Sequence, residues 1–542
     1  MVRLLRLRSF SARPALAPAL VTLLLATSCG GVRPGSTATL APEEATRMFA
    51  AGYTNIDDMY ISKVDIGELA VAGLSNLTKL DPDLTFRQSG HRVEIALAGH
   101  PAGGFDSPRA HNIDEWASVT AGAISLARTA SPDLAKDNPE DVYKTVFEGM
   151  LGKLDRFSRY STPDSAREHR AAREGFGGIG VRVAVDGEGV RVSSVMSDGP
   201  GGRAGLKADD LITHIDGEPV VGVELQNIIQ RLRGPIGSHV SLTLVRAGGA
   251  QNLSITRAHI VPETVVYERR GSVGYIRLYS FNQDTTRTLS AAVRRAKQEI
   301  GVDLTGLVLD LRDNPGGLLD QAVGVSDLFM QSGRIVTTRG RHPDSHQRFD
   351  ATKGDIADGL PIVVLVNGNS ASASEIVAAA LQDSGRAVIA GTTSYGKGTV
   401  QTVIRMPNQG ELTLTWARFH APSGYTIHHL GVLPSVCTAS DSAAEHILAA
   451  LKDGKVSPLP IALRNSATPE DVPVLDRLRS SCPARKTDEP VDLDVAVKLV
   501  NDGPLYRQAL SLASPTDTVT ASAKGGAGAA SAIALELPPA QP

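Results

Sequence analysis

Short apolar runs alternate with helix-period segments between residues 259 and 437. The continuous apolar runs, typical of strands buried on both faces, are Leu307–Leu311, Ile362–Val366 and Ala387–Ala390. Helical periods follow the first two runs, over Leu318–Phe329 and from Ser372 to Gln382. This alternation predicts a parallel or mixed sheet with crossover helices. Because such folds build sites at the carboxyl ends of strands, we expect functional residues in the turns that follow the runs.

Residues 175–257 show a different pattern, with short strands around one or two short helices. The strand patterns cover Val181–Val185, Val190–Val195 and Val240–Arg246, and a helical period covers Leu225–Leu232. This arrangement resembles a PDZ domain. In that family a glycine-rich loop presents backbone N–H groups to the terminal carboxylate of a peptide. The matching residues here are Gly178, Ile179, Gly180 and Val181. A plain glycine turn before a strand is the alternative interpretation of these four residues.

The flanking segments are helical or low in complexity. Residues 43–80 and 139–172 carry helical periods, and between them only Arg92–Ala98 has a strand pattern. Further helical stretches surround Asp441–Leu451 and Leu493–Leu512. The predicted organisation is a signal segment at 1–28, a tether and helical region at 29–172, a PDZ-like domain at 173–258, an α/β core at 259–437, a helical region at 438–512 and a disordered tail at 513–542.

The first 28 residues have the pattern of a targeting segment. Four arginines precede an apolar run from Ala15 to Ala26, which suits a signal sequence and is too short to span a bilayer. The run ends before Cys29, which resembles the lipid-acceptor cysteine of a bacterial lipoprotein, although Ala26 stands where leucine is usual. Ordinary signal cleavage is the alternative to lipid attachment. The pattern therefore predicts export.

Composition excludes one class of partner. Charged residues make up 21% of the chain and the formal net charge is −3. Removal of residues 1–28, which hold four arginines and no acidic residue, changes that charge to −7. Nucleic acid is therefore not an expected partner. Cys437 and Cys482 can pair in an oxidising compartment or remain free thiols, and the sequence does not decide between these states.

The chemistry centres on residues 370–401, which offer serines and a glycine-flanked lysine but no histidine. Ser372 and Glu375 form a capping-box pattern, and capping alone explains both residues. A serine at a helix N-terminus also lies where the helix dipole stabilises developing negative charge. If Ser372 is a nucleophile, Lys397 is the only base nearby in sequence.

Two other motifs are alternative interpretations of the sequence around Lys397. Residues 391–398 nearly match a phosphate-binding loop, but Gly398 cannot ligate magnesium and the following residues have a strand pattern where a helix is required. Ser394 and Lys397 also spell S-x-x-K, yet Gly396 weakens the helical turn that this motif needs and its partner motifs are missing. A solvated lysine in a glycine turn remains the structural alternative.

The joint spacing resembles that of the carboxyl-terminal processing peptidases, also called tail-specific proteases. That family shows S-A-S-A-S-E, then A-x-x-x-Q-D, then G-K-G-T-V-Q. This chain has the same order, with 25 residues from Ser372 to Lys397 and 4 from Lys397 to Gln401. The resemblance covers roughly residues 141–436 and includes L-D-L-R-x-N-P-G-G at 309–317. It implies a crotonase-like or Clp-like fold for the core.

The resemblance implies that Ser372 is the nucleophile, Lys397 the general base and Gln401 the residue that orients the lysine. A lysine with its ordinary pKa of about 10.4 is almost fully charged at neutral pH, so burial must lower that pKa. Gln401 can accept a hydrogen bond from the amine without adding a negative charge that would raise the pKa again. Because residues four apart in a regular strand lie about 13 Å from each other, this role requires a bend, which Gly398 permits.

The resemblance also implies an oxyanion hole made by backbone N–H groups. Its donors are those of Ala373 and of Gly317 or Gly316. Glu375 is expected mainly to cap its helix. The departures from the family pattern are Ser394 where threonine is common, Asp313 where asparagine or serine is common, and Ser435 where aspartate is usual.

The sequence thus predicts an exported serine endopeptidase of the bacterial periplasm or cell envelope that cleaves proteins near or from their C-terminal tails. Its expected partners are polypeptide substrates engaged through their C-termini, together with the membrane if Cys29 carries lipid. We expect no cofactor and no metal. The main alternative is a catalytically idle PDZ scaffold. An acyl-CoA enzyme on the same core is a further alternative, but no adenine-nucleotide motif supports it.

Overall fold

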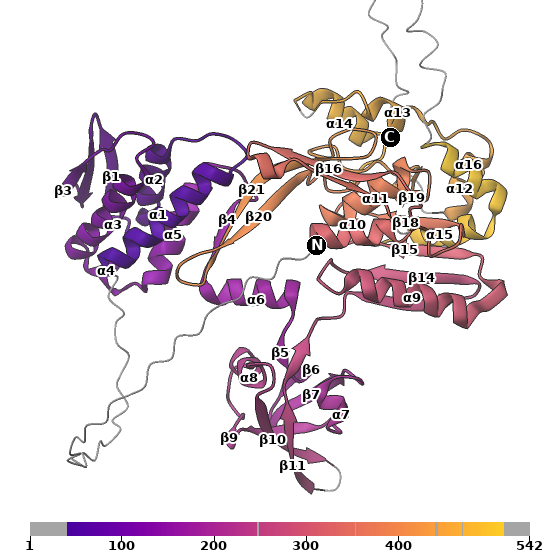
Figure 1. Cartoon of the computed structure of the whole chain (residues 1–542), viewed down its shortest axis with the longest axis horizontal. Coiled ribbons are helices and arrows are strands. Elements are labelled where there is room, and N and C mark those ends of the chain that lie inside the picture. The colour runs from indigo at the N-terminus through magenta and orange to yellow at the C-terminus, as the bar shows by residue number, and fades with distance from the viewer. Residues whose placement is uncertain (1–40, 247–248, 353, 440–442, 469, 514–542) are drawn as a thin grey trace, which may run out of the picture. The chain divides into compact units, whose positions relative to one another are not determined.

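The computed structural model describes residues 41–246, 249–352, 354–439, 443–468 and 470–513 (Figure 1). The predicted signal segment at 1–28, Cys29 and all but the first residue of the predicted tail lie outside these ranges. In the described part of the chain, no helix combines the length and apolar character needed to cross a membrane.

A six-stranded sheet forms the centre of the predicted α/β core. Its strand order is β13-β14-β15-β18-β19-β22; β13 is antiparallel to β14 and every other pair is parallel. The three apolar runs of the sequence are β15, β18 and β19, so the predicted mixed sheet is confirmed. The strands are β13 (Val265–Arg270), β14 (Val273–Leu278), β15 (Gly306–Asp310), β18 (Ile362–Val366), β19 (Val388–Gly391) and β22 (Val436–Cys437).

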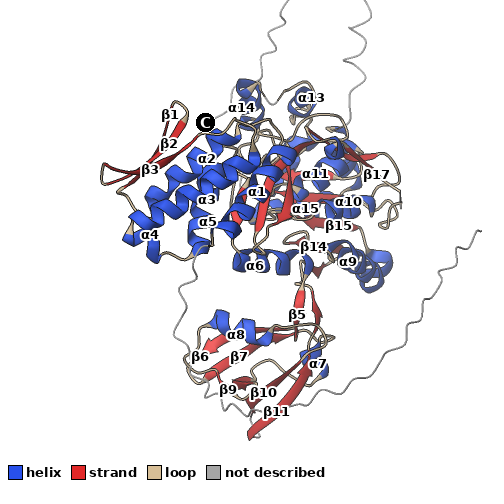
Figure 2. Ribbon diagram, turned by 60° about the vertical axis from the view of Figure 1, so that its left-hand side comes forward, coloured by secondary structure: helices blue, strands red, loops and turns tan. Residues whose placement is uncertain are grey.

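Helices cover both faces of this sheet (Figure 2). Alternate side chains such as Leu309 and Val364 pack against α9, α10 and α11, whereas Val308 and Val363 pack against α12, α15 and α16. The predicted crossover helices are α10 and α11. The helices are α9 (Thr285–Ile300), α10 (Leu319–Asp327), α11 (Ala373–Asp383), α12 (Ala444–Lys452), α15 (Pro490–Asn501) and α16 (Gly503–Ser511). The C-terminal region therefore completes the burial of the sheet.

A second, antiparallel sheet continues from the lysine-bearing loop. It has the order β17-β16-β21-β20, and β4 pairs with β21. Met406, Leu412 and Leu414 of the β20–β21 hairpin belong to the core of the N-terminal region. Its strands are β4 (Arg159–Ser161), β16 (Arg334–Gly340), β17 (Gln347–Asp350), β20 (Thr399–Arg405) and β21 (Glu411–His420).

The N-terminal region is helical with a small three-stranded sheet, β1-β2-β3. The predicted helical segments and the strand over Arg92–Ala98 are present; β1, β3, β4, α3 and α4 were not predicted. The elements are α1 (Pro42–Met59), α2 (Ile66–Ser75), β1 (Leu84–Ser89), β2 (Arg92–Leu97), β3 (His100–Asp106), α3 (Ile113–Ala130), α4 (Pro132–Lys136), α5 (Pro139–Leu151) and α6 (Pro163–Glu174). A 3₁₀ turn, η1 (Asn76–Lys79), follows α2.

The PDZ-like region has a core of its own. Its sheet has the order β11-β10-β8-β7-β6, which leaves β6 at an edge, and β9 pairs with β8. The strands predicted at 181–185, 190–195 and 240–246 and the helix at 225–232 are all present. The elements are β5 (Phe176–Gly178), β6 (Val181–Asp186), β7 (Gly189–Val195), α7 (Pro200–Arg203), β8 (Leu211–Ile215), β9 (Glu218–Pro219), α8 (Leu225–Leu232), β10 (His239–Arg246), β11 (Gly249–Thr256) and β12 (Ala258–Ile260).

Two short helices in the C-terminal region were also not predicted. They are α13 (Leu459–Arg464) and α14 (Val472–Ser480). Leu475 and Leu478 of α14 are buried in the same apolar cluster as α10 and α11. Beyond α14, Cys482 forms a disulfide with Cys437 of β22, so the structure holds the two cysteines in the paired state.

Candidate active site

Ser372 ends the turn that leaves β18 and immediately precedes α11. Its backbone has φ 57° and ψ −112°, a conformation that is costly for a residue with a Cβ atom. Its N–H donates to Glu375 Oε2 at 2.8 Å, which is the carboxylate half of the predicted capping box. The turn thus fixes a half-buried serine at a helix N-terminus.

The N-P-G-G turn after β15 packs directly against the serine turn. Asn314 O accepts hydrogen bonds from Ala371 N–H at 3.0 Å and from Ser374 Oγ at 2.9 Å. Gly316 has φ 99°, and a Cβ atom added there would lie 2.7 Å from Ala371 O and 2.9 Å from Ser372 Cβ. Only glycine fits such an approach, so the two turns that were predicted to build the site do meet.

Two backbone amides at this junction are free to bind a ligand. Within the described ranges, neither Ala373 N–H nor Gly317 N–H has a hydrogen-bond acceptor. Gly316 N–H, by contrast, donates to Asn314 Oδ1 at 2.9 Å. Of the two glycines that the sequence left open, Gly317 therefore has the available donor.

Glu375 joins the serine turn to the loop that carries Lys397. Its buried carboxylate accepts hydrogen bonds from Ser394 Oγ at 2.5 Å, Gly396 N–H at 2.7 Å and Lys397 N–H at 2.9 Å, in addition to that from Ser372. Burial raises the pKa of Glu375, and these hydrogen bonds act in the opposite direction. The sequence predicted mainly a capping role for Glu375 and gave no sign of its contacts with the lysine loop. No local pattern signals them, because they reach about 20 residues along the chain.

The side chain of Lys397 is partly buried beside the loop that precedes β4. Its Nζ lies 5.1 Å from the centroid of the Phe157 ring, a cation–π distance. Burial lowers the pKa of Lys397, nearby Arg159 lowers it further, and Glu375 and Asp155 raise it; the net shift is downward. This is the direction that use of the lysine as a base requires.

Within the described residues, Gln401 makes its hydrogen bonds to threonines and none to the lysine. Its Nε2 donates to Thr399 Oγ1 at 2.9 Å and to Thr415 Oγ1 at 3.3 Å. Among the residues that the structure describes, no hydrogen bond joins Lys397 Nζ to Gln401 or to Ser372. The ladder is irregular between Val400 and Gln401, so the strand departs from regular spacing there.

The predicted carboxylate loop lies between β5 and β6. Gly178 pairs with Ala258, and Val181 begins the edge strand β6. Gly180 has φ 73°, which suits glycine. The N–H groups of Ile179 and Gly180 have no acceptor in the part of the chain described here. These four residues make no described hydrogen bond to the serine turn or to the lysine loop.

Known protein families match both the α/β core and the PDZ-like region of this chain. The family described as Peptidase family S41 matches residues 272–438, and the PDZ domain family matches residues 191–246. The carboxy-terminal-processing protease of Bartonella bacilliformis is 43% identical over 304 residues, which are 55% of this chain and 70% of that protein. The chain belongs to the carboxy-terminal-processing proteases of peptidase family S41. It is a serine-type C-terminal processing peptidase with a PDZ domain, as the sequence predicted.

Other relatives of this S41 peptidase include a probable CtpA-like serine protease of Staphylococcus aureus. That protein is 33% identical over 305 residues, which are 56% of this chain and 61% of the relative. A solved structure named photosystem II D1 C-terminal processing protease is 26% identical, covers 72% of this chain and 92% of its own, and has a TM-score of 0.36.

The peptidase has further surface features outside these sites. Among the described residues, no group of three or more His, Cys, Asp or Glu side chains is arranged to hold a metal ion.

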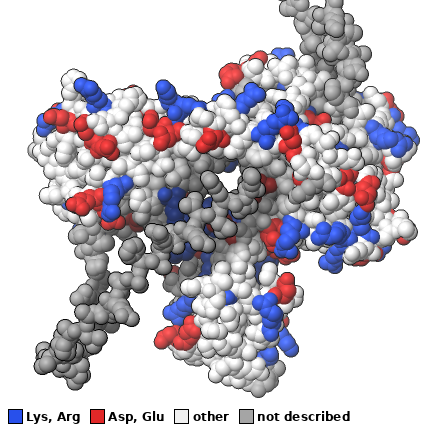
Figure 3. All heavy atoms as spheres, in the orientation of Figure 1, with Lys and Arg blue, Asp and Glu red and all other residues white. Residues whose placement is uncertain are grey.

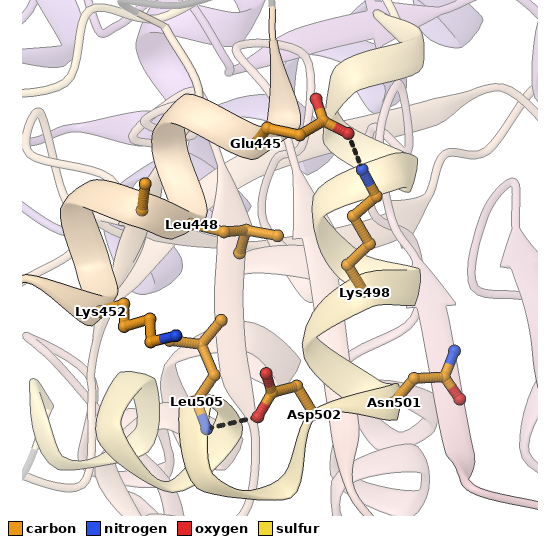
Figure 4. Close-up of a pocket in the computed structure, with 8 residues that line it drawn as sticks. Glu445, Leu448, Lys452, Lys498, Asn501, Asp502 and Leu505 are labelled. Carbon is orange, nitrogen blue, oxygen red and sulfur yellow. Dashed lines mark hydrogen bonds and ion pairs between the residues drawn. The ribbon is translucent and has the colours of Figure 1, made fainter.

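A surface hollow between α12, α15 and α16 is lined by the Glu445–Lys498 ion pair and by Asp502, which accepts from Leu505 N–H (Figure 4). The ion pair joins α12 to α15, and Asp502 caps the N-terminus of α16. Acidic and basic side chains are interspersed over the face shown in Figure 3.

Proposed function

We propose that this peptidase cleaves polypeptides near or from their C-terminal tails, with Ser372 as nucleophile and Lys397 as general base. The observation that carries the proposal is the set of four hydrogen bonds at Glu375, which fastens the lysine loop to the serine turn. Ser372 and Lys397 are 25 positions apart in sequence, and their backbone N–H groups both donate to the Glu375 carboxylate. The lowered pKa of Lys397 supports the same assignment.

In the proposed reaction, neutral Lys397 takes the proton from Ser372 Oγ while that oxygen attacks the scissile carbonyl. The oxyanion accepts hydrogen bonds from Ala373 N–H and Gly317 N–H, and the N-terminus of α11 favours its negative charge. The protonated amine then gives its proton to the leaving amine. Water hydrolyses the acyl-enzyme with Lys397 again as base.

Because the described residues include no hydrogen bond between Lys397 Nζ and Ser372, the lysine side chain must move to take the serine proton. Gln401 supports this step, because its Oε1 accepts no hydrogen bond within the described part of the chain. We infer that Oε1 accepts from Lys397 Nζ when the amine faces Ser372. A neutral amide in this role leaves the pKa of the lysine low, whereas a carboxylate would raise it.

The PDZ domain is proposed to engage the substrate tail. The free N–H groups of Ile179 and Gly180 suit a terminal carboxylate, and the edge strand β6 can pair with an extended peptide. A labelled peptide should bind through its free carboxylate and lose affinity as the C-terminal amide. Gly180→Ala, at φ 73°, should weaken binding, whereas Gly187→Ala, where nothing lies within 4 Å of the added methyl, should not.

Residues 1–28 are proposed to export the chain, with Cys29 as the site of lipid attachment. Metabolic labelling with a fatty acid tests this directly. Label should appear on the wild-type protein and be absent from Cys29→Ser; equal labelling of both would contradict lipid attachment at this residue.

Cleavage of an unstructured protein tests the catalytic proposal. Wild type should cut it, and Ser372→Ala and Lys397→Ala should each lower kcat by about a thousandfold or more. Lys455→Ala, at an exposed site in the C-terminal region, is the matched control and should retain activity. If wild type leaves the protein whole but binds its tail, the chain acts as a PDZ scaffold instead.

A further inference from the structure

The segment that follows α14 contacts both turns of the proposed active site. Residues 479–488 are here called the clamp segment. They begin in the last turn of α14 and end two residues before α15. The lysine loop, residues 392–398, has no helix or strand of its own. Its backbone groups therefore depend on partners supplied by other parts of the chain.

Arg479 is the first of these partners. Its Nη1 donates to Ser394 O at 3.1 Å and to Leu430 O at 2.7 Å, and it lies 3.4 Å from His429 O. One guanidinium thus ties the lysine loop to residues 429–430. Charge-assisted hydrogen bonds of this kind are stronger than those between neutral groups.

The remainder of the clamp segment contacts the loop through its backbone. Cys482 O accepts from Thr393 Oγ1 at 2.5 Å, and Arg485 N–H donates to Thr392 Oγ1 at 3.1 Å. Together with Arg479, these contacts hold three consecutive residues of the lysine loop, the last of which, Ser394, also donates to Glu375.

The same segment reaches the turn that leads to Ser372. Arg485 O accepts from Gly368 N–H at 2.6 Å, and Lys486 O accepts from Asn369 Nδ2 at 2.9 Å. The clamp segment therefore bridges the loops after β18 and after β19. Those loops carry the proposed nucleophile and the proposed base.

The clamp segment is itself fastened at two internal positions, Cys482 and Arg485. The Cys437–Cys482 disulfide ties it to β22, which pairs with β19, the strand that leads into the lysine loop. Arg485 Nη2 donates to the buried Asp492 of α15 at 2.6 Å. The clamp segment can thus transmit the rigidity of the sheet to the loops after β18 and after β19.

We propose that the clamp segment holds the lysine loop against Glu375 and that Arg479 is a positioning residue for the reaction of Ser372 with Lys397. This inference rests on the proposed function of that pair. The clamp acts through the Arg479 guanidinium and through its own backbone groups, and none of the hydrogen bonds described for it involves Ser372 Oγ or Lys397 Nζ. Loosening it should therefore lower the fraction of molecules in which the lysine is placed to react.

A pair of variants on α14 tests the role of Arg479. Arg479→Gln should lower kcat by about tenfold or more with KM little changed, since it removes charge-assisted contacts to the loop. Arg477→Gln is the matched control, because Arg477 is exposed on the same helix. Arg479→Lys should recover part of the loss. Equal kcat values for Arg479→Gln and Arg477→Gln would overturn the proposal.

Hydrogen exchange separates failure of the clamp from failure of the proposed function. In the Ser372→Ala background, the peptide over residues 392–398 should exchange about tenfold faster in Arg479→Gln and remain protected in Arg477→Gln. Faster exchange in a protein whose wild type has no peptidase activity would keep the clamp and overturn the proposed function. Unchanged exchange would overturn the clamp.

Reduction of the disulfide gives the same test without a substitution at Arg479. A water-soluble phosphine converts the bond to two thiols and becomes the phosphine oxide with oxygen from water. Exchange of residues 392–398 should rise and kcat should fall in wild type, while Cys437→Ser/Cys482→Ser should no longer respond to the phosphine. A reduced wild type with unchanged kcat and exchange would contradict the proposal, even if Arg479→Gln fails to fold.

Discussion

At the scale of single residues, Glu375 shows why position in sequence does not reveal every role. The capping-box pattern predicted its bond to Ser372, which is local, but its bonds to Ser394, Gly396 and Lys397 depend on the return of the chain after β19. The family spacing located the serine and the lysine. The contacts that hold them together required the fold.

Glu375→Gln should weaken both the fold and the chemistry. A carboxylate accepts from four donors here, whereas an amide has one accepting oxygen and a donor NH₂ that faces other donors. We expect a loss of about 2 kcal/mol or more in unfolding free energy and a fall in kcat. Thermal melts and kinetics measure these effects. A variant with wild-type melting temperature and kcat would show that the four contacts do not position the loop.

Lys397→Met should stabilise the protein in a pH-dependent manner. Burial lowers the folded-state pKa of Lys397 below its ordinary value of 10.5. In the pH window between these two pKa values, the unfolded chain therefore binds a proton that the folded chain lacks. Wild-type stability from this group thus rises with pH through the window. The melting temperature of Lys397→Met should exceed that of wild type most at neutral pH and least near pH 10.5. A constant difference would contradict the lowered pKa.

At the scale of elements, sequence predicted what is periodic or continuous. Strands β15, β18 and β19 are buried on both faces and therefore appear as unbroken apolar runs. Strand β3 was missed because its sequence, H-P-A-G-G-F-D, has no alternation and only one strong strand former, Phe105. Strand β4 has three residues and exists because β21 pairs with it, so tertiary contact decides it.

The N-P-G-G turn gives a prediction with a built-in control. Gly316→Ala and Gly333→Ala place alanine at nearly equal φ, 99° and 98°, but only the first methyl meets neighbouring atoms, those of the serine turn. Both variants should lose about 1–2 kcal/mol of stability from backbone strain. Only Gly316→Ala should also lower kcat, because the turn must shift away from Ser372. Melts and kinetics on both variants check this, and equal kcat values would disprove close contact between the turns.

At the scale of the whole molecule, the sequence separated regions that the structure joins. The helical region after residue 437 had no assigned role, yet α12, α15 and α16 bury one face of the six-stranded sheet and the clamp segment reaches the lysine loop. These helices pack on strands far away in sequence, and no motif announces the partners. The PDZ domain was predictable because its pattern is local and its core is its own.

Deletion of the PDZ domain should separate binding from chemistry. Gly178 and Ala258 are paired, so a short linker can replace residues 179–257. We expect KM for a protein with a free C-terminus to rise by about tenfold, equal to about 1.4 kcal/mol, through loss of the tail contact. The kcat for a short peptide without a terminal carboxylate should be unchanged. Equal KM values for the two proteins would contradict tail capture by this domain.

In the proposed mechanism, Ser372 reacts because Lys397 activates it. Treatment with a serine-directed phosphonate, followed by peptide mapping by mass spectrometry, tests this most directly. We expect one adduct, on Ser372, that forms in wild type and is lost in Lys397→Ala while Lys455→Ala labels normally. An adduct on another residue, or labelling of Ser372 at the wild-type rate without Lys397, would contradict it.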